Sequence, residues 1–517
     1  MGWVVRETAG MQGTSDLTHV ELLDAQAHCR HLVSDGSVYA FLADHRRALF
    51  PDELFADLFP SGRGRPSVPA DVVATVMVLQ ALEGLSDRDA CQQLACNIAW
   101  KVACGLALTD PGFHPSVLTL WRARLRASDR PERIFAVVRR VVHATGVLKG
   151  KTRRALDSTL LDDAVATQDT VTQLVAAIRR VRRLVPAAAT LQLGAHDYNQ
   201  PGKPACVWDD DQARERLVSG LVTDALAVLA EVKDVELDAA GAEAVGLLGV
   251  VAGQDVEPGE RPGCWRIARR VAPDRVISVV DADSRHMHKS RASYRDGYKA
   301  HLAAEPETGL VTAARLTPAN AGDGPTGLQL LSDEPDALEV LADSAYGGGE
   351  TRAGLRAAGH LQTIKPLPLR AAVPGGFTKD DFRIDLDQQT VTCPAGHTVG
   401  ITPSSQAVFG QRCSGCPLRA RCTTAKDGKT LRVHPHEAEL AAARRRANAP
   451  EFIASYRQWR PLVERSIAWL VAGGNRRVPY RGLARNQQWL SLRVAAINLR
   501  RLVTMGLNHH SAGWMLA

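Results

Sequence analysis

The sequence lacks any apolar run long enough to cross a membrane. No window approaches the roughly eighteen uninterrupted apolar residues that a transmembrane helix requires. The opening stretch, MGWVVRETAGMQG, also lacks the charged-then-apolar layout of a secretory signal. We therefore expect a cytoplasmic protein that has no membrane partner.

Lysine is scarce among the basic residues: of 63 basic side chains, 52 are arginine and 11 are lysine. The formal net charge of +7 is only a mild basic excess. Planar guanidinium groups suit bidentate contacts with phosphate, although a GC-rich genome or a solvated surface would explain the same bias. Basic clusters occur at residues 139–140, 179–183, 444–446, 476–477 and 500–501.

With 517 residues, 45% of them apolar, the chain is long enough for two to four globular domains. Residues 1–50 predict a helical segment, and residues 51–150 predict an all-α domain. Within this domain, an apolar helix at Val72–Leu82 is followed by Gly84 and by Ser86, a good N-cap for the next helix. This is the outline of a helix-turn-helix, so the domain is interpreted as either DNA-binding or a plain packing domain.

The pattern changes after residue 150, where strands begin to alternate with helices. We assign residues 151–369 and 436–510 to one α/β domain, which a helical insertion interrupts at about 166–260. The second and third predicted strands flank a short turn and therefore read as a hairpin. The predicted strands are Arg154–Leu161, Tyr298–Ala303, Leu310–Ala314, Ala337–Leu341 and Leu361–Ile364.

Three acids stand out in this domain. Asp157 falls mid-strand among apolar neighbours, where an unpaired charge is costly. Asp343 follows the C-terminal end of a strand, an edge where sheet active sites are commonly built. Glu464 lies on a predicted helix, Tyr456–Asn475, one turn after Arg460. Three such carboxylates can serve two Mg²⁺ ions in phosphoryl transfer.

Each of these acids has a competing interpretation. Glu464 can instead form a surface ion pair with Arg460, and Pro461 can kink the helix or mark its first turn. Other acids also follow strands and can replace a member of the set. These competitors are Asp162, Asp163, Asp281 and Asp283.

Residues 370–435 are poor in periodic runs and hold four of the ten cysteines. The spacing C-x19-C-x2-C-x5-C, in a loop-rich segment, predicts a structural zinc site. His397 is an alternative fourth ligand, and four unrelated reduced thiols are the other interpretation. The predicted zinc ligands are Cys393, Cys413, Cys416 and Cys422.

Several motifs together resemble the DDE transposases of bacterial insertion sequences, over about residues 45–508. The N-terminal motifs are GRPSVP and GLSDRDACQQL. The catalytic-domain motifs are ALDSTLL, YRDGYKAHLAAEPETGLVTAARLTPANAGD, VLADSAYGGGE, YRQWRPLVERSIAWL, RVPYRG and NLRRLV. The resemblance implies a ribonuclease-H-like catalytic domain, with a mixed sheet flanked by helices and a Cys-rich insertion.

The resemblance also implies roles for the three acids and for a DNA contact. Asp157, Asp343 and Glu464 match the family's catalytic triad, which binds Mg²⁺ or Mn²⁺, and two ions are expected. Arg460 matches the family's phosphate-contacting arginine. Tyr456 lies four residues before that arginine, whereas the family's tyrosine often lies three before it.

The sequence departs from the family at the end of the same helix. Val471 stands where the family often has a lysine, and Arg476 and Arg477 are the nearest residues able to replace that DNA contact.

The implied reaction is metal-dependent cleavage at transposon ends, followed by strand transfer into target DNA in cut-and-paste transposition. The expected partners are double-stranded DNA with terminal inverted repeats, target DNA and a second copy of the chain. A nucleoid-associated protein of the bacterial cytoplasm follows from this activity. The alternatives are a domesticated DNA-binding protein, a zinc-containing regulator, or a nuclease of the same fold that no longer transposes.

Overall fold

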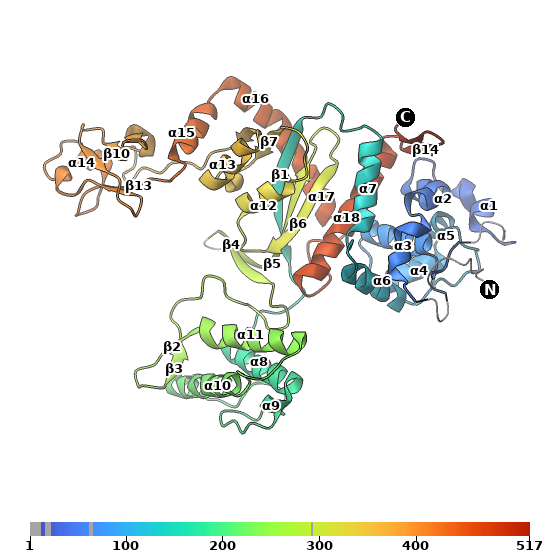
Figure 1. Cartoon of the computed structure of the whole chain (residues 1–517), viewed down its shortest axis with the longest axis horizontal. Coiled ribbons are helices and arrows are strands. Elements are labelled where there is room, and N and C mark those ends of the chain that lie inside the picture. The colour runs from blue at the N-terminus through green and yellow to red at the C-terminus, as the bar shows by residue number, and fades with distance from the viewer. Residues whose placement is uncertain (1–11, 16–21, 62–65, 291–292) are drawn as a thin grey trace.

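The computed structural model describes residues 12–15, 22–61, 66–290 and 293–517. A central sheet lies between a group of N-terminal helices and a small Cys-containing lobe, and a separate helical insertion extends from one edge (Figure 1). The predicted N-terminal segment, residues 1–50, and the GRPSVP motif fall partly outside the described residues.

The central sheet is mixed and follows the order β4-β5-β1-β7-β8, with β6 also paired to β5. β5 is antiparallel to β1 and β6, whereas β7 and β8 run parallel to β1. The predicted strands and the predicted hairpin are confirmed. The sheet also contains β4, which was not predicted. Its strands are β1 (Arg153–Asp162), β4 (Arg285–Ser290), β5 (Ser293–Ala304), β6 (Val311–Pro318), β7 (Glu339–Ala342) and β8 (Leu361–Ile364).

Helices cover both faces of this sheet. α12 (Asp323–Leu330) and α13 (Gly349–Ala357) lie on one face, where they enclose a core that includes Leu156. α17 (Val463–Val471) and α18 (Leu483–Thr504) lie on the other face, over the main core. Successive residues of a strand point to opposite faces, so β1 contributes side chains to both cores.

The N-terminal helices share the main core with the sheet and α18. α3 is buried along residues 70–81, so the first helix of the predicted helix-turn-helix outline is a core helix. Gly84 ends it in the left-handed region (φ 73°), and Ser86 caps α4 as predicted. The helices are α1 (Ala25–Cys29), α2 (Val38–Leu49), α3 (Ala70–Glu83), α4 (Asp87–Cys96), α5 (Ile98–Cys104), α6 (Ser116–Ala127) and α7 (Arg133–Ala144).

The prediction of one continuous helix over Tyr456–Asn475 is wrong. α16 (Pro450–Trp459) ends there, a 3-10 turn η7 (Arg460–Leu462) follows, and α17 begins at Val463. Pro461 causes the break, because it has no backbone N–H and its ring clashes with the carbonyl four residues earlier.

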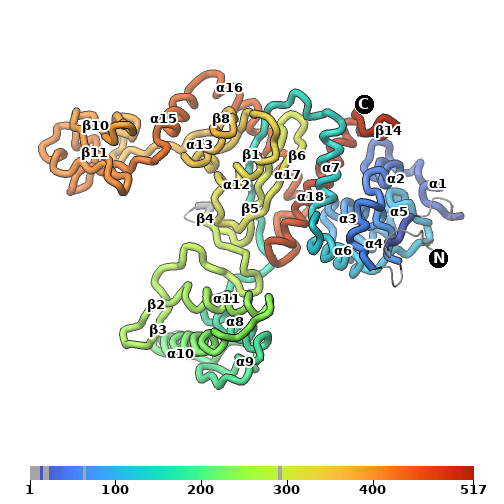
Figure 2. Tube along the Cα trace, in the orientation of Figure 1, coloured from blue at the N-terminus to red at the C-terminus, as the bar shows by residue number. Residues whose placement is uncertain are grey.

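The helical insertion and the Cys-containing lobe each have a hydrophobic core of their own. The insertion leaves the sheet after β1 and returns before β4 (Figure 2). It contains α8 (Thr170–Leu184), α9 (Pro186–Ala189), α10 (Asp211–Glu231), α11 (Ala239–Gln254), β2 (Val256–Pro258) and β3 (Trp265–Ile267). The lobe contains β9 (Arg383–Asp385), β10 (Thr390–Thr392), β11 (Thr398–Gly400), β12 (Gln406–Val408), α14 (Arg419–Cys422) and β13 (Thr430–Arg432).

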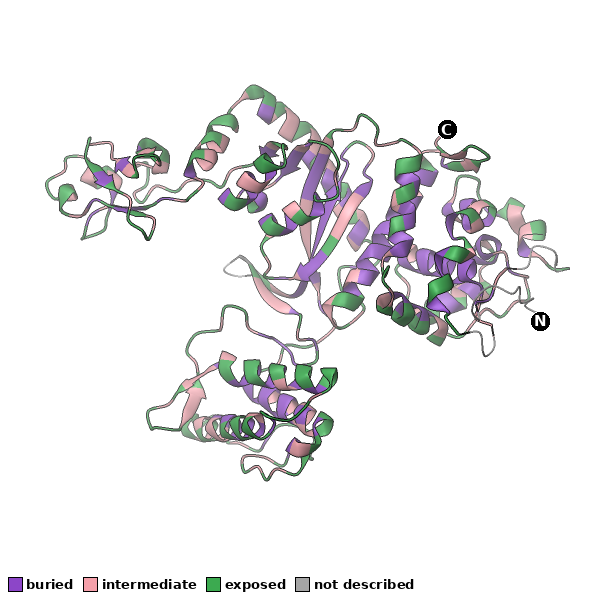
Figure 3. Ribbon diagram, in the orientation of Figure 1, coloured by how far each residue is buried: buried purple, intermediate pink, exposed green. Residues whose placement is uncertain are grey.

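Two smaller elements complete the C-terminal half. α15 (Glu437–Arg446) leads from the lobe back to α16, and a hairpin of β14 (Asn508–His510) and β15 (Gly513–Met515) follows α18. Buried residues concentrate in the sheet, in α18 and in the N-terminal helices (Figure 3). Among the helices of the described residues, none is long and apolar enough to cross a bilayer.

Arg493 on α18 joins the N-terminal helices to α17. The side chain is only 3% exposed, and its guanidinium donates to the carbonyls at the ends of two other helices. These acceptors are Ala81 and Leu82 of α3 (2.8 Å to Leu82), and Trp469 (2.8 Å), Leu470 (3.2 Å) and Ala472 (2.9 Å) at the end of α17. The last carbonyls of a helix lack intrahelical partners, so a cation suits this position.

We predict that Arg493→Met lowers the free energy of unfolding by roughly 3 kcal/mol or more, because each buried carbonyl left without a partner costs about 1–3 kcal/mol. Arg500→Met is the matched control: Arg500 lies on the same helix, and within the described residues its side chain stacks over the Trp469 ring, 5.9 Å from the ring centroid, without a hydrogen bond. Urea denaturation would measure both variants, and equal losses would contradict this role for Arg493.

Candidate active site

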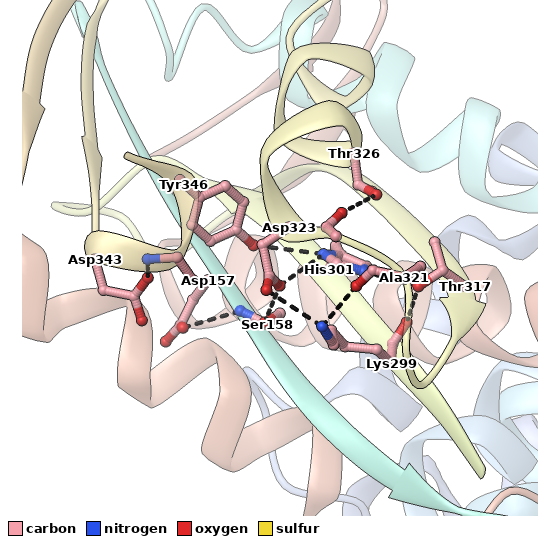
Figure 4. Close-up of polar contacts among 12 residues, drawn as sticks. Asp157, Ser158, Lys299, His301, Thr317, Ala321, Asp323, Thr326, Asp343 and Tyr346 are labelled. Carbon is pink, nitrogen blue, oxygen red and sulfur yellow. Dashed lines mark hydrogen bonds and ion pairs between the residues drawn. The ribbon is translucent and has the colours of Figure 1, made fainter. Parts of the chain in front are cut away.

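Asp157 and Asp343 lie side by side because their strands are neighbours. β1 runs parallel to β7 with Ala155 opposite Leu341. Two further positions along this register bring Asp157 beside Asp343, just past the end of β7. Since paired strands lie about 4.8 Å apart, both carboxylates reach the same region of the sheet edge. Figure 4 shows the two side chains next to each other.

A backbone N–H holds each of these carboxylates. Asp157 Oδ1 accepts from Ser158 N at 2.9 Å, and Asp343 Oδ1 accepts from Ala345 N at 2.9 Å, where Asp343 caps the 3-10 turn η4 (Ser344–Tyr346). The Asp157 side chain is 15% exposed and that of Asp343 is 46% exposed. Burial raises the pKa of Asp157, and Arg460 together with the Ser158 N–H opposes this shift.

The guanidinium of Arg460 lies between the two aspartates. Its Nη2 is 3.1 Å from Asp157 Oδ1 and 3.9 Å from Asp343 Oδ2. The residue is 8% exposed, and its Nε and Nη1 atoms have no hydrogen-bond partner among the described residues. The competing interpretation, a surface ion pair between Arg460 and Glu464, is therefore wrong: Arg460 is buried and pairs with the aspartates.

Glu464 has no contact with this pair in the described part of the chain. It is exposed in the first turn of α17, where an acid suits the helix dipole, and it makes no hydrogen bond or ion pair within the described part of the chain. Burial raises the pKa of Tyr456, and Arg460 opposes this shift. The charges of Asp343, Asp157 and Glu464 raise the same pKa further. The structure thus brings the two aspartates together, whereas Glu464 is linked to them only through their common influence on the pKa of Tyr456.

Glu339 on β7 anchors the helix that leads to Arg460. Its carboxylate accepts from Ser455 Oγ of α16 at 2.6 Å, from Thr363 Oγ1 at 2.7 Å and from Arg153 Nε at 2.8 Å. Arg153 also lies over the Trp459 ring, 4.7 Å from its centroid. These contacts fix α16 against the sheet edge, so η7 begins directly beside the aspartates.

Arg476 and Arg477 lie on an exposed turn at the far end of β1. The turn continues the sheet, since Asp162 N donates to Arg476 O at 2.8 Å. Arg476 Nη1 donates to Leu160 O at 3.4 Å, and Arg477 Nε donates to Asp163 O at 2.9 Å. Both guanidinium groups are thus held at the surface of the strand that carries Asp157.

The competing acids have structural partners at that same end of β1. Asp281 is 2% exposed and accepts from Tyr298 OH at 2.6 Å. Asp283 accepts from Leu483 N at the start of α18, at 2.7 Å. Asp162 pairs with Arg295 at 2.7 Å, and Asp163 accepts from Ser284 Oγ at 2.5 Å.

The four cysteines of the lobe lie near one another. All four, together with His397, line one small cavity, and all four are free thiols. Burial raises the pKa of Cys422, and Cys413, Cys393 and Cys416 raise it further. Within the described residues, no group of three or more His, Cys, Asp or Glu side chains is arranged to hold a metal ion, in this lobe or beside Asp157.

Sequence reasoning missed a buried polar cluster directly behind the aspartates. It contains Ser158, Lys299, His301, Asp323 and Tyr346. The available signal was His301, which interrupts the apolar stretch of β5. A polar residue at a buried strand position requires a partner, and partners from other elements cannot be identified from the strand alone.

The contacts of Glu339 predict a pH-dependent stability. Burial alone would raise the pKa of Glu339, but the bonds from Ser455, Thr363 and Arg153 together hold it below its ordinary 4.5. A depressed pKa stabilises the fold above pH 4.5, and this contribution is lost as the pH falls through the lower folded value. We expect Glu339→Gln to cost about 1–2 kcal/mol at pH 7 and much less at pH 3.

Thermal unfolding of the wild type and the variant at both pH values would test this expectation. Glu350→Gln is the control, because the Glu350 side chain is 78% exposed on α13 and, in the described part of the chain, pairs with His436 alone. A Glu339→Gln cost that is equal at pH 3 and pH 7 would contradict the ionic role of this carboxylate.

Two family models match the chain. One, described as a transposase DDE domain, covers residues 392–503 and therefore includes Tyr456, Arg460 and Glu464. The other, described as a transposase domain (DUF772), covers residues 30–124 of the N-terminal helices. The chain has no significant match among curated proteins or among solved structures. These two matches, at the two ends of one shared core, identify the chain as a DDE transposase of the insertion-sequence type.

Proposed function

We propose that Asp157, Asp343 and Glu464 are the catalytic carboxylates of this transposase. The observation that carries the proposal is the adjacency of Asp157 and Asp343, both within 4 Å of one cationic nitrogen. The exposed Glu464 raises the pKa of Tyr456, as both aspartates do. The sheet supports a ribonuclease-H-like domain, because three antiparallel strands (β6, β5, β1) continue into two parallel ones (β7, β8).

The site also suits divalent cations. The Arg460 guanidinium already occupies a cation position between two carboxylates, and hard oxygen donors are the ligands that Mg²⁺ and Mn²⁺ prefer. Asp157, Asp343 and Glu464 would hold two such ions, the number that phosphoryl transfer between an attacking and a leaving oxygen calls for. Bound ions would stabilise the charge that develops on the attacking and leaving oxygens of a phosphoryl transfer.

The surrounding residues of the chain have distinct tasks in this proposal. Two guanidinium nitrogens of Arg460 have no hydrogen-bond partner among the described residues, so they can bind a DNA phosphate oxygen while Nη2 remains beside Asp157. Tyr456 borders the same acids and would contact the DNA backbone. Val471 packs against the main core, and the exposed Arg476 and Arg477 would take the phosphate contacts beyond it.

The proposed reaction has two steps of the same type. In the first, a water oxygen attacks the phosphorus at the transposon end, and the bond to the 3′-oxygen breaks to leave a free 3′-hydroxyl. In the second, that hydroxyl attacks a phosphorus of the target DNA, and the target's own 3′-oxygen leaves. Cut-and-paste transposition requires the first step on both strands at each end, so that the element leaves the donor DNA before it is joined, and neither step forms a covalent protein–DNA intermediate.

The substrate implies how the chain would assemble. A transposon has two ends with terminal inverted repeats, so one subunit at each end gives a homodimer on DNA. The helical domain at residues 51–150 would read the repeats. A protein that cuts and joins chromosomal DNA would work at the bacterial nucleoid.

We also propose a structural Zn²⁺ in the lobe, held by Cys393, Cys413, Cys416 and Cys422. Support comes from the four thiols and His397 around one cavity, and from the electrostatic influence of three of these thiols on the fourth. The lobe's hydrophobic core is small, and a thiolate-bound metal would add the cross-link that such a segment lacks.

We expect Asp157→Asn, Asp343→Asn and Glu464→Gln each to slow strand cleavage by roughly a thousandfold, since several kcal/mol of charge stabilisation would be lost. The assay uses duplex DNA that spans the flanks of the coding sequence, with Mg²⁺ or Mn²⁺, and follows cut and joined products. Asp162→Asn is the control, because Asp162 lies on the same strand and pairs with Arg295.

Cleavage by Glu464→Gln at the wild-type rate would remove Glu464 from the site. Activity that persists in EDTA would remove the metal ions from the proposal. DNA that is cut but never joined would instead favour a nuclease of the same fold.

For the lobe, we expect the purified protein to contain about one zinc per chain. The double variant Cys413→Ser/Cys416→Ser should lose most of it, whereas Cys96→Ser, at an exposed position of α4, should retain it. Elemental analysis by mass spectrometry measures both. A zinc-free wild type would refute the site.

A further inference from the structure

A buried polar cluster connects five elements of the fold behind the two aspartates (Figure 4). Its side chains come from β1, β5, β6, the start of α12 and η4. None of them belongs to the proposed catalytic set. The members are Ser158, Lys299, His301, Thr317, Asp323 and Tyr346.

The first link runs from β1 to α12. Ser158 directly follows Asp157, and its Oγ donates to Asp323 Oδ1 at 2.7 Å. Ser158 N meanwhile donates to the Asp157 carboxylate at 2.9 Å. Successive strand residues point to opposite faces, so one residue holds Asp157 in front and the cluster behind.

Asp323 is itself fixed in place. It is the first residue of α12, where a negative charge suits the helix dipole, and its Oδ2 accepts from Lys299 Nζ at 3.2 Å. Lys299 Nζ also donates to Ala321 O at 2.8 Å, and its side chain is 4% exposed. The carboxylate is thus a rigid acceptor for Ser158.

The second link runs to the turn that carries Asp343. Tyr346, three residues after Asp343, is 1% exposed, and its hydroxyl lies 3.5 Å from His301 Nδ1. Asp323 Oδ1 lies 3.5 Å from the same nitrogen, and His301 Nε2 lies 2.9 Å from Thr317 Oγ1 of β6. His301 therefore joins the two links.

Close packing keeps Tyr346 in this position. Gly327 of α12 approaches the ring so closely that a Cβ there would lie 2.8 Å from Tyr346 Cδ1. The residue at this point of α12 has no room for a side chain, so the helix presses directly on the ring. The turn that begins at Asp343 is consequently held between α12 and the sheet.

We propose that Ser158 and Tyr346, through Asp323 and His301, are positioning residues that set the distance between the Asp157 and Asp343 carboxylates for cation binding. Apolar side chains of similar size would fill the same space, and buried polar groups are costly unless paired. Hydrogen bonds, unlike apolar contacts, fix the orientation of their partners. Here they connect Ser158, the residue after Asp157, with Tyr346 in the turn that begins at Asp343. The inference rests on the proposed metal site.

The test is a Mn²⁺ titration of the full-length protein, with free Mn²⁺ followed by electron paramagnetic resonance. Ser158→Ala and Tyr346→Phe each remove one hydroxyl and little volume. We expect each to weaken Mn²⁺ binding by roughly tenfold, as for other partners that orient metal ligands. In strand cleavage, the Mn²⁺ concentration for half-maximal rate should rise by a similar factor, while the rate at saturating Mn²⁺ stays near that of the wild type.

Tyr198→Phe is the matched control. Tyr198 is a buried tyrosine of the helical insertion whose hydroxyl donates to Asp224 at 2.8 Å. This variant should lose comparable thermal stability without a change in Mn²⁺ affinity. Wild-type Mn²⁺ affinity in Ser158→Ala and Tyr346→Phe, or an equal loss in Tyr198→Phe, would overturn the positioning role.

Asp157→Asn separates this inference from the proposal on which it rests. If Asp157→Asn abolishes Mn²⁺ binding but the two positioning variants bind normally, only the positioning role fails. If Asp157→Asn binds Mn²⁺ as the wild type does, or if the wild type binds none, the metal site and the positioning role both fail.

Discussion

Two carboxylates on neighbouring parallel strands repel each other unless a cation lies between them. Asp157 and Asp343 are in this arrangement, and the Arg460 guanidinium is the cation that the chain itself provides. Burial makes this requirement stronger, because the Coulomb energy of an unscreened pair grows as the local dielectric falls. The break that Pro461 causes between α16 and α17 serves this requirement, since the resulting turn η7 carries Arg460 to the two aspartates.

The rest of the fold holds that turn in place from both sides. Upstream, Glu339 binds Ser455 and fixes α16 against β7. Downstream, Arg493 binds the carbonyls at the end of α17 and those at the end of α3. The core of the N-terminal helices is continuous with the core beneath the site, so these helices and the sheet pack as one body.

The front and back of β1 have complementary tasks. In front, Asp157 forms an ion pair with Arg460. Behind, the Ser158 hydroxyl donates a hydrogen bond to the Asp323 carboxylate, and this contact lies outside the proposed catalytic set. A site that binds and releases multiply charged groups benefits from such a fixed layer, because ligands held in advance do not have to be reorganised during the reaction.

The sequence by itself determined the local features. The strand around Asp157, the hairpin that contains His301 and the cap at Ser86 all follow from short-range periodicity and capping rules. Only the tertiary structure decided that β7 lies beside β1, that Arg460 pairs with the aspartates rather than with Glu464, and that Asp323 meets Ser158. Each of these contacts joins residues more than a hundred positions apart, and local propensity carries no information about which distant strands and turns will pack together.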